Sequence, residues 1–453
     1  MQTFDLIVIG AGSGLNISSA AAEKGLKVAV VEKGPMGGTC LNRGCIPSKI
    51  IIHSADVAEA IRSSHKFGIN SKLTSIDFKK IISRASKIVD KESKEIKDAI
   101  IEDKNTTLFN LEAKFVSDRT LKAGKEIIKG KKIIIAAGTR PLIPKIEGLK
   151  DVDFITSDEA LRLKKLPKCM TILGGGYIAA ELAHFYGSLG TEINIVQRGK
   201  YLVPNEDEEI SKKFTEIFSK KFKIITEFDA TKVSKKGKNI VVKAEGKKGK
   251  KKIISDVLLV AAGRIPNTDI LDVSKTNVSL SEKGFIKTNQ YLETTAKNIW
   301  ALGDIAGKFL FKHSANLEAQ YVYSNAVLGK RIAADYHAMP HAIFSSPQIA
   351  GVGLREQDLK NKKINYAAGK YYYSKSGMGQ ALQDNDGFVK IFADRKTRKI
   401  IGCHILGTDA STLIHEIVVA MKNNLAVDSI SNSVHIHPAL SEVVQRAVNN
   451  IKW

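Results

Sequence analysis

The sequence predicts an α/β protein with two doubly wound parallel sheets, followed by a smaller α+β domain. Two strand–glycine–helix units, FDLIVIGAGSG and CMTILGGGYIAAE, each start a βαβ segment. Two further segments, KKIIIAAGTRP (131–141) and DVLLVAAGRIPN (256–267), are apolar strands ending in Ala-Ala-Gly, and each is placed to complete one sheet. Beyond about residue 338, short strands alternate with helical segments, which indicates the α+β domain.

Composition narrows the class of protein. The chain has 453 residues, 43% of them hydrophobic, which is ordinary for a globular protein of about three domains. Its net charge is +23, but the lysines are scattered, and the densest run (235–252) is typical of a hairpin with a solvated turn. No nucleic-acid-binding module is present, so we expect a positive field that attracts phosphorylated cofactors rather than a nucleic-acid partner.

The N-terminal sequence MQTFDLIVIGAG lacks the basic and apolar regions of a signal peptide. No apolar stretch approaches the roughly 18 residues that span a bilayer. We therefore expect a cytoplasmic protein with no membrane partner. The chain has four cysteines, and a cysteine pair in that compartment is more often a redox or metal site than a structural disulfide.

The first glycine turn contains Gly10, Gly12 and Gly14 between a strand and a helix. Glycines there let the backbone approach a pyrophosphate, which the helix N-terminus attracts. Glu32 ends the next strand, where an acid suits the hydroxyls of an adenosine ribose. Leu15 departs from the usual small residue, so helix–strand packing must differ slightly. The turn predicts a Rossmann-like dinucleotide site; the alternative is a tight turn without a ligand.

The second turn, with Gly174, Gly176 and Ala179, fits the dinucleotide pattern fully. Its following strand ends in Gln197 and Arg198 rather than in an acid. A guanidinium in place of a carboxylate suits a 2′-phosphate, so the sequence favours NADPH over NADH. The alternative is that Arg198 is only a solvated strand end.

The segment GGTCLNRGCIPSK (37–49) holds two of the four cysteines. Zinc is disfavoured, because neither Cys169 nor Cys403 supplies the second closely spaced pair of a zinc site. Pro47 suits the first turn of a helix, which places Cys45 at the helix N-terminus, where a thiolate is favoured. Cys40, expected in the glycine-flanked loop, could reach disulfide distance. Such asymmetry is what thiol–disulfide exchange needs.

This segment resembles the active-site signature of the FAD-dependent pyridine nucleotide–disulfide oxidoreductases, such as dihydrolipoamide dehydrogenase, glutathione reductase and mycothione reductase. The resemblance covers essentially the whole chain, in the order FAD turn, cysteine pair, AAGTRP, nicotinamide turn, AAGRIPN, ALGDIAG and a C-terminal HPALSE. It implies a homodimer. The implied domains are FAD-binding (1–145 and 265–337), NAD(P)-binding (146–264) and interface or dimerisation (338–453).

The resemblance also implies separate roles for the two cysteines. Cys40 would attack the substrate, and Cys45 would lie against the flavin as the charge-transfer thiol. Lys49 would pair with Glu181 near the flavin and tune its potential. Tyr177 would cover the flavin until the nicotinamide displaces it.

His437 and Glu442 match the family's acid–base pair, which would act on Cys40 of the partner subunit. The chemistry agrees, because a thiolate leaving group needs a proton and a carboxylate can fix the imidazole tautomer. His435 is the competing candidate.

The resemblance further implies a set of cofactor contacts. For FAD they are Gly10, Gly12, Gly14, Glu32, Lys33, Gly38, Thr39, Lys49, Ala113, Gly138, Asp304 and Ala315; for NAD(P) they are Gly174, Gly176, Tyr177, Ala179, Gln197, Arg198 and Gly263.

Two substrate classes are open: a dihydrolipoamide dehydrogenase-like activity is the main expectation, and reduction of a low-molecular-weight thiol disulfide is the alternative. CLNRGCIPSK is most similar to dihydrolipoamide dehydrogenase, which implies a small dithiol or a lipoyl domain as substrate. GAGSGLN, FKHSANLEAQ and IHPALSEVV are more similar to mycothione reductase, and the predicted NADPH preference also favours a reductase of a low-molecular-weight thiol disulfide. A mercuric reductase would need cysteines near the C-terminus, and none lies beyond Cys403. A non-catalytic flavoprotein is disfavoured, because the cysteine pair and His437 are intact.

Overall fold

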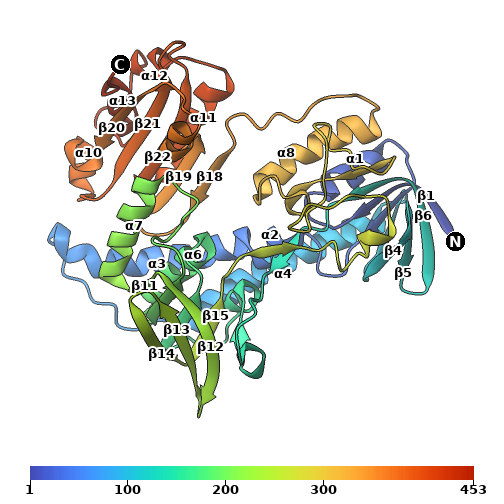
Figure 1. The fold of residues 1–453 in the computed structure, drawn as a ribbon, viewed down its shortest axis with the longest axis horizontal. Coiled ribbons are helices and arrows are strands. Elements are labelled where there is room, and N and C mark those ends of the chain that lie inside the picture. Colours follow the sequence, from blue (N-terminus) through green and yellow to red (C-terminus); the bar gives the residue numbers. More distant parts are fainter. The chain divides into compact units, whose positions relative to one another are not determined.

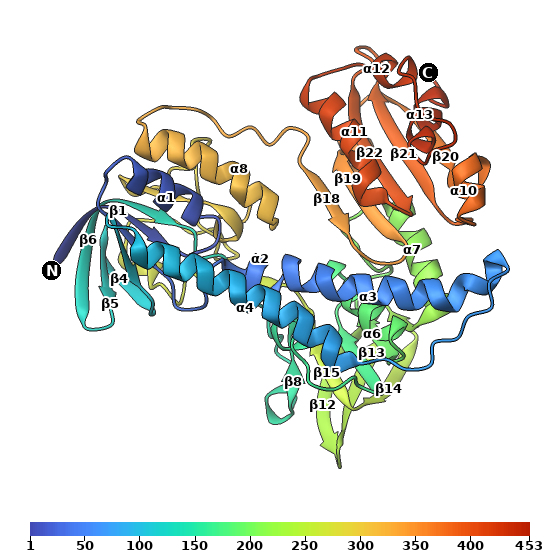
Figure 2. The ribbon, with the colours of Figure 1, turned by 180° about the vertical axis from the view of Figure 1, so that it is seen from behind.

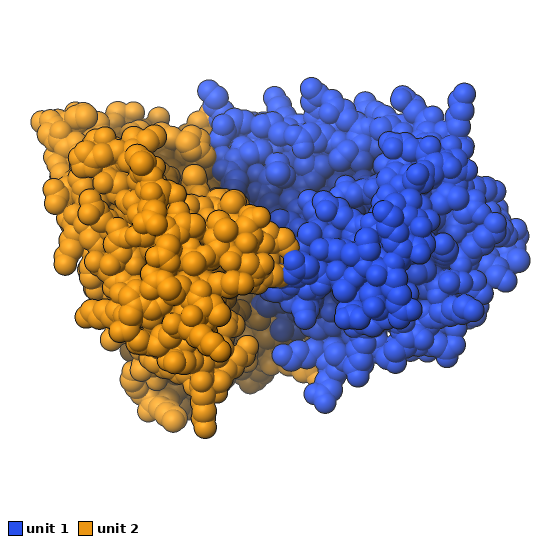
Figure 3. Space-filling model, turned by 90° about the horizontal axis from the view of Figure 1, so that it is seen from above, with its two compact units in different colours: residues 1–50, 79–142, 263–336 blue, residues 51–78, 143–262, 337–453 orange.

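The computed structural model describes all 453 residues, which form two compact units (Figure 3). The first unit contains residues 1–50, 79–142 and 263–336, and the second contains 51–78, 143–262 and 337–453. Each unit is therefore assembled from three separate stretches of chain. No helix has the combination of length and hydrophobicity needed to cross a membrane.

A seven-stranded sheet forms the first unit, in the order β3-β2-β1-β6-β5-β4, with β17 also paired to β6. The strands β1 (Gln2–Ile9), β2 (Val28–Val31), β3 (Thr106–Phe109), β6 (Glu126–Ile135) and β17 (Ile299–Ala301) are parallel. The strands β4 (Ala113–Ser117) and β5 (Thr120–Ala123) form an antiparallel extension. The small pair β7 (Thr139–Pro141) and β16 (Arg264–Pro266) is also antiparallel.

Both faces of this sheet are covered, which explains the unbroken apolar run of β1. Leu6 and Val8 pack with Ile17 of α1 (Leu15–Glu23) and Ala319 of α8 (Lys312–Val322), and Figure 1 shows the two helices together over the sheet. Ile7 points to the opposite core. This unit also contains α2 (Gly38–Arg43), the start of α3 (Cys45–Ser63) and all but the first residue of α4 (Phe78–Glu102).

The second unit contains a parallel sheet in the order β11-β10-β9-β15-β8. Its strands are β8 (Phe154–Ile155), β9 (Cys169–Leu173), β10 (Glu192–Gln197), β11 (Lys223–Thr226) and β15 (Val257–Val260), and its helices are α5 (Ser157–Ala160), α6 (Tyr177–Ser188) and α7 (Glu208–Lys221). The lysine-rich run was expected to be one hairpin. It instead forms three antiparallel strands, β12 (Phe228–Lys236), β13 (Asn239–Gly246) and β14 (Gly249–Ser255), because the run contains two turns.

The C-terminal part of the second unit is an antiparallel sheet in the order β18-β19-β22-β21-β20. Its strands are β18 (Pro340–Ile343), β19 (Gln348–Gly353), β20 (Tyr366–Tyr372), β21 (Phe388–Asp394) and β22 (Ile400–Gly407). The helices α11 (Ala410–Lys422) and α13 (Glu442–Asn449) pack on this sheet (Figure 2), and the shorter helices are α9 (Glu356–Asn361), α10 (Gly377–Ala381) and α12 (Asp428–Ser431). The α/β fold with a C-terminal α+β domain is thus confirmed, while the finer domain boundaries stay predictions.

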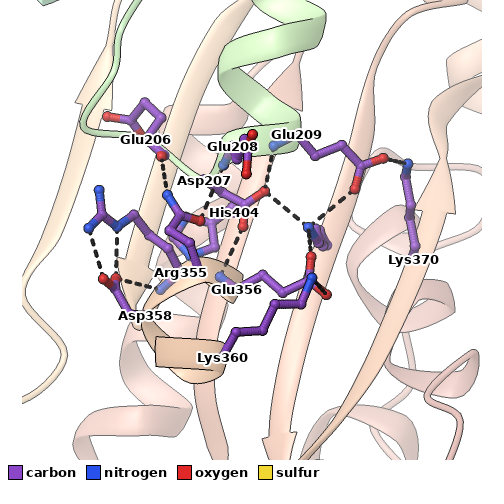
Figure 4. Close-up of polar contacts among 12 residues, drawn as sticks. Glu206, Asp207, Glu208, Glu209, Arg355, Glu356, Asp358, Lys360, Lys370 and His404 are labelled. Carbon is purple, nitrogen blue, oxygen red and sulfur yellow. Dashed lines mark hydrogen bonds and ion pairs between the residues drawn. The ribbon is translucent and has the colours of Figure 1, made fainter. Parts of the chain in front are cut away.

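An ion cluster connects α7 to this antiparallel sheet within the second unit (Figure 4). Lys390 of β21 is only 7% exposed, and its Nζ lies 3.0 Å from Asp207, 2.8 Å from Glu356 and 3.2 Å from Glu209. Asp207 is fully buried and also caps α7 by accepting from the Glu209 backbone N–H. Burial alone would lower the pKa of Lys390, but the surrounding carboxylates raise it well above its ordinary value.

Candidate active site

The two predicted redox cysteines lie on two consecutive helices, Cys40 on the short α2 and Cys45 on the long α3. Cys40 lies within α2 and not in a loop as expected, because TCLNR, between Gly38 and Gly44, contains no helix breaker. Cys45 is the first residue of α3, as the position of Pro47 predicts. Gly44 (φ −149°, ψ −116°) breaks the helical path between them. Cys45 is exposed and Cys40 is half-buried.

The two thiols differ electrostatically. Cys45 hydrogen-bonds to Cys40, and this bond together with burial raises the pKa of the Cys40 thiol well above its ordinary value, whereas the charge of Lys312 lowers it. Cys45 lies at a helix N-terminus, where the dipole favours a thiolate. The other two cysteines belong to the second unit: Cys169 begins β9, and Cys403 is buried in β22. The structure contains no cluster of three or more His, Cys, Asp or Glu side chains suited to a metal ion.

In the first glycine turn, the backbone at Gly10 lies directly against the backbone that follows β6. Gly10 has φ +105°, and a Cβ there would lie 2.3 Å from the Ala136 carbonyl oxygen. The helix α1 has Gly14 at its N-cap with no side-chain cap and no acid in its first turn, so its N-terminus suits an anionic ligand. Glu32 is held beside the turn, where its carboxylate accepts from Ala11 N (2.9 Å) and Gly34 N (2.7 Å). These residues fit the pyrophosphate and ribose of FAD.

The second turn repeats this geometry. Gly174 has φ +110°, and its added Cβ would lie 2.3 Å from the Ala261 carbonyl oxygen. The two Ala-Ala-Gly segments therefore serve the same purpose, since each presents a carbonyl against the first glycine of a turn. Gly176 caps α6 without a side-chain cap, and an added Cβ there would meet nothing within 4 Å. This turn fits a dinucleotide as well as the first.

The strand after the second turn ends without a carboxylate. The Gln197 side chain is buried and donates from Nε2 to the Tyr201 carbonyl oxygen (3.3 Å). Arg198, the next residue, is exposed. At the strand end itself Gln197 is neutral and Arg198 carries a positive charge.

The pair His437 and Glu442 is formed within one chain. His437 Nδ1 lies 3.1 and 3.2 Å from the two carboxylate oxygens of Glu442, the first residue of α13. The hydrogen bond with His437 lowers the pKa of Glu442. The His437 side chain is 76% exposed. His435 differs, because its side chain is 7% exposed and its two ring nitrogens contact Glu416 (2.8 Å) and the Ser433 carbonyl oxygen (3.0 Å).

The remaining predicted residues are distributed over both units. Asp304 accepts from Thr139 Oγ1 (2.8 Å), and burial raises the pKa of its carboxyl. Lys33 makes an exposed ion pair with Glu112 (3.5 Å). Ala113 begins β4, Gly138 follows β6, and Ala315 lies on α8.

Tyr177 begins α6, and Gly263 directly precedes β16. Lys49 and Glu181 belong to different units, and their pairing stays a prediction.

Sequence reasoning missed Lys312, which begins α8 in the segment FKHSANLEAQ and acts electrostatically on Cys40. A lysine in the first turn of a helix gives no signal by itself.

Comparisons with known proteins agree with this geometry. Residues 4–326 match the model of the pyridine nucleotide-disulphide oxidoreductases, and residues 339–448 match the dimerisation domain of that family. The chain belongs to the FAD-dependent pyridine nucleotide–disulfide oxidoreductase family. Members of this oxidoreductase family use NAD(P)H, and the dimerisation domain supports a homodimer.

Several curated members of the family are similar over nearly the full length. The chain is 34% identical to mycothione reductase of Mycobacterium tuberculosis (strain H37Rv), covering 100% of both chains. It is 32% identical to dihydrolipoyl dehydrogenase of Bacillus subtilis (strain 168), covering 98% of this chain and 95% of that one. It is 33% identical to mercuric reductase of Staphylococcus aureus, covering 98% of this chain and 82% of that one.

Among solved structures of such oxidoreductases, the HOCl-induced flavoprotein disulfide reductase RclA from Escherichia coli is similar over 100% of both chains. Its TM-score is 0.88 at 25% sequence identity. The whole chain therefore has the fold of a flavoprotein disulfide reductase.

Proposed function

We propose that the protein uses NADPH to reduce the disulfide of a low-molecular-weight thiol, through the Cys40–Cys45 pair. The observation that carries the choice is the strand end at Gln197 and Arg198, which offers a guanidinium and no carboxylate to the adenosine ribose. Overall identity does not separate the substrate classes, because it is 34% to a mycothione reductase and 32% to a dihydrolipoyl dehydrogenase. We place this activity in the cytoplasm, where thiols are kept reduced.

FAD, when bound, supplies the two-electron relay between the nicotinamide and the cysteine pair. The thiol chemistry is carried by the chain itself. Cys40 attacks one sulfur of the substrate disulfide, forming a mixed disulfide as the substrate S–S bond breaks. The departing thiolate takes a proton from His437 of the partner subunit. Cys45 then attacks the Cys40 sulfur, which forms the Cys40–Cys45 disulfide and releases the second half of the substrate as a thiolate that is protonated from solvent.

The contact between His437 and Glu442 supports the proton transfer. Because Nδ1 faces the carboxylate, Nε2 is the nitrogen left to face a substrate. The carboxylate also holds the ring in this orientation. The helix N-terminus at Cys45 supports the thiolate that closes the cycle.

A second candidate is dihydrolipoamide dehydrogenase, which the segment CLNRGCIPSK favours. It uses the same residues in the opposite direction, with a small dithiol or a lipoyl domain as the electron donor. A positive field from the net charge of +23 does not distinguish the two.

Steady-state assays separate these candidates. FAD-loaded protein is given NADPH or NADH with a panel of disulfides (cystine, glutathione disulfide, coenzyme A disulfide and mycothiol disulfide). In parallel, it is given dihydrolipoamide with NAD⁺ or NADP⁺. Our proposal expects NADPH oxidation with a member of the disulfide panel to give the highest kcat/KM. Fastest turnover with dihydrolipoamide would instead favour the second candidate.

A further inference from the structure

Lys312 is a half-buried lysine fixed beside the first glycine turn. Its Nζ donates to Ser13 Oγ (3.0 Å), and Ser13 in turn donates to Asn316 Oδ1 (2.9 Å). Ser13 is buried within the turn, and Asn316 lies one helical turn after Lys312 on α8. The ammonium is therefore held through Ser13, whose hydroxyl is itself fixed by Asn316.

The same turn also contacts the helix that carries Cys40. A Cβ added to Gly38, the first residue of α2, would lie 2.8 Å from Gly12 Cα, so the two backbones touch. Cys40 follows on the same helical turn. Lys312 and the first residue of the helix that carries Cys40 thus contact adjacent residues of the turn, Ser13 and Gly12.

The charges of these groups act on one another. Burial lowers the pKa of Lys312, and the charges of Cys40 and Cys45 act against this effect. Lys312 in turn lowers the pKa of Cys40. The titratable groups that face Cys40 are Cys45 and Lys312. An ammonium has three N–H donors, and only one of them is used on Ser13.

We propose that Lys312 stabilises the thiolate form of the reduced Cys40–Cys45 pair. The helix N-terminus at Cys45 supplies about half a positive charge, and Lys312 adds a full one in a partly buried site. The inference rests on the proposed function in that the pair must cycle through its reduced form. Lys312 acts here as a positioning residue, through its charge.

The test measures thiolate formation directly. FAD-loaded protein is reduced, freed of reductant and alkylated with iodoacetamide at a series of pH values, and modification of Cys40 and Cys45 is quantified by mass spectrometry. We expect Lys312→Met to move the midpoint of the alkylation profile upward by roughly one to three pH units. Lys312→Arg should keep the parent profile, and so should Lys330→Met, which removes an exposed lysine of the same unit.

A Lys312→Met profile that coincides with the parent profile would overturn the proposal. If that variant does not fold, Lys312→Gln and Ser13→Ala replace it, with an upward shift expected for both and a smaller one for Ser13→Ala. The assay is independent of turnover. A shifted profile in a protein that reduces no disulfide contradicts the proposed function alone, and an unshifted profile in an active enzyme contradicts only the role of Lys312.

Discussion

The carboxylate of Glu442 lies 3.1 Å from Nδ1 of His437, and the imidazole is 76% exposed although the carboxylate is nearly buried. A nearly buried carboxylate thus orients an exposed ring. Because His437 lowers the pKa of Glu442, this acid stays ionised until the pH falls below the ordinary range of a glutamate.

We expect His437→Gln to lower kcat for disulfide reduction by roughly 10²–10⁴-fold, because the leaving thiolate loses its acid. Glu442→Gln should give a smaller loss. The rate at which NADPH reduces the enzyme, measured by stopped-flow absorbance, should be the same in both variants as in the parent. His435→Gln is the control, and loss of turnover in that variant alone would show that the wrong histidine was chosen.

We expect Cys45→Ser to abolish disulfide turnover while the protein still folds and binds FAD. The parent enzyme, titrated anaerobically with NADPH, should develop a long-wavelength thiolate–flavin band that the variant lacks. Cys169→Ser is a matched control, because a serine there can still accept from Asn194 Nδ2, which lies 3.3 Å from the Cys169 sulfur. A band that persists in Cys45→Ser would rule out its role as the charge-transfer thiol.

Arg198→Ala should weaken NADPH use selectively. Loss of a charge-assisted contact to a 2′-phosphate predicts a decrease of roughly tenfold or more in kcat/KM for NADPH, with little change for NADH. Lys236→Ala, which removes an exposed charge from β12, controls for the general positive field. An unchanged NADPH/NADH ratio in Arg198→Ala would contradict the cofactor argument.

Lys390→Met should strongly destabilise the second unit. Removing the lysine leaves buried Asp207 and its neighbouring carboxylates without their counter-charge, and such a loss costs about 3–5 kcal/mol in the free energy of unfolding. Lys360→Met removes a lysine that is 64% exposed and pairs with the same Glu356, so about 0–1 kcal/mol is expected. Urea unfolding monitored by circular dichroism gives the free energy of unfolding of each variant. Equal losses for Lys390→Met and Lys360→Met would mean that the cluster does not stabilise the unit.

The same cluster predicts an acid sensitivity. Burial alone would raise the pKa of Glu356, but the hydrogen bonds and charge of Lys390 lower it from 4.5 to about 2. A carboxyl whose pKa is lower in the folded state adds stability above its unfolded pKa, and this is lost as the pH falls from about 4.5 towards 2. Glu356→Gln should therefore flatten the dependence of the urea midpoint on pH in that window. Glu245→Gln, an exposed substitution, should not.

The parallel strands, both glycine turns and the start of α3 could be predicted because their signals are local. The strand β20 (Tyr366–Tyr372) could not, because the Ala-Ala-Gly-Lys interior of YAAGKYY disfavours a strand, which forms through its pairing with β21. The contact of Lys312 with Ser13 joins α8 to the first glycine turn, and the two are distant in sequence. The ion cluster around Lys390 likewise combines charges from three separate elements, each of which alone looks like an ordinary surface residue.

The discontinuous make-up of the first unit has a consequence for biosynthesis. β17 (Ile299–Ala301) pairs with β6, so the sheet behind the first glycine turn is completed only after the intervening stretch 143–262 has been translated. That stretch carries its own parallel sheet and can fold on the ribosome while the flavin site still lacks a strand. We therefore expect a nascent chain to acquire its nicotinamide site before it can retain FAD.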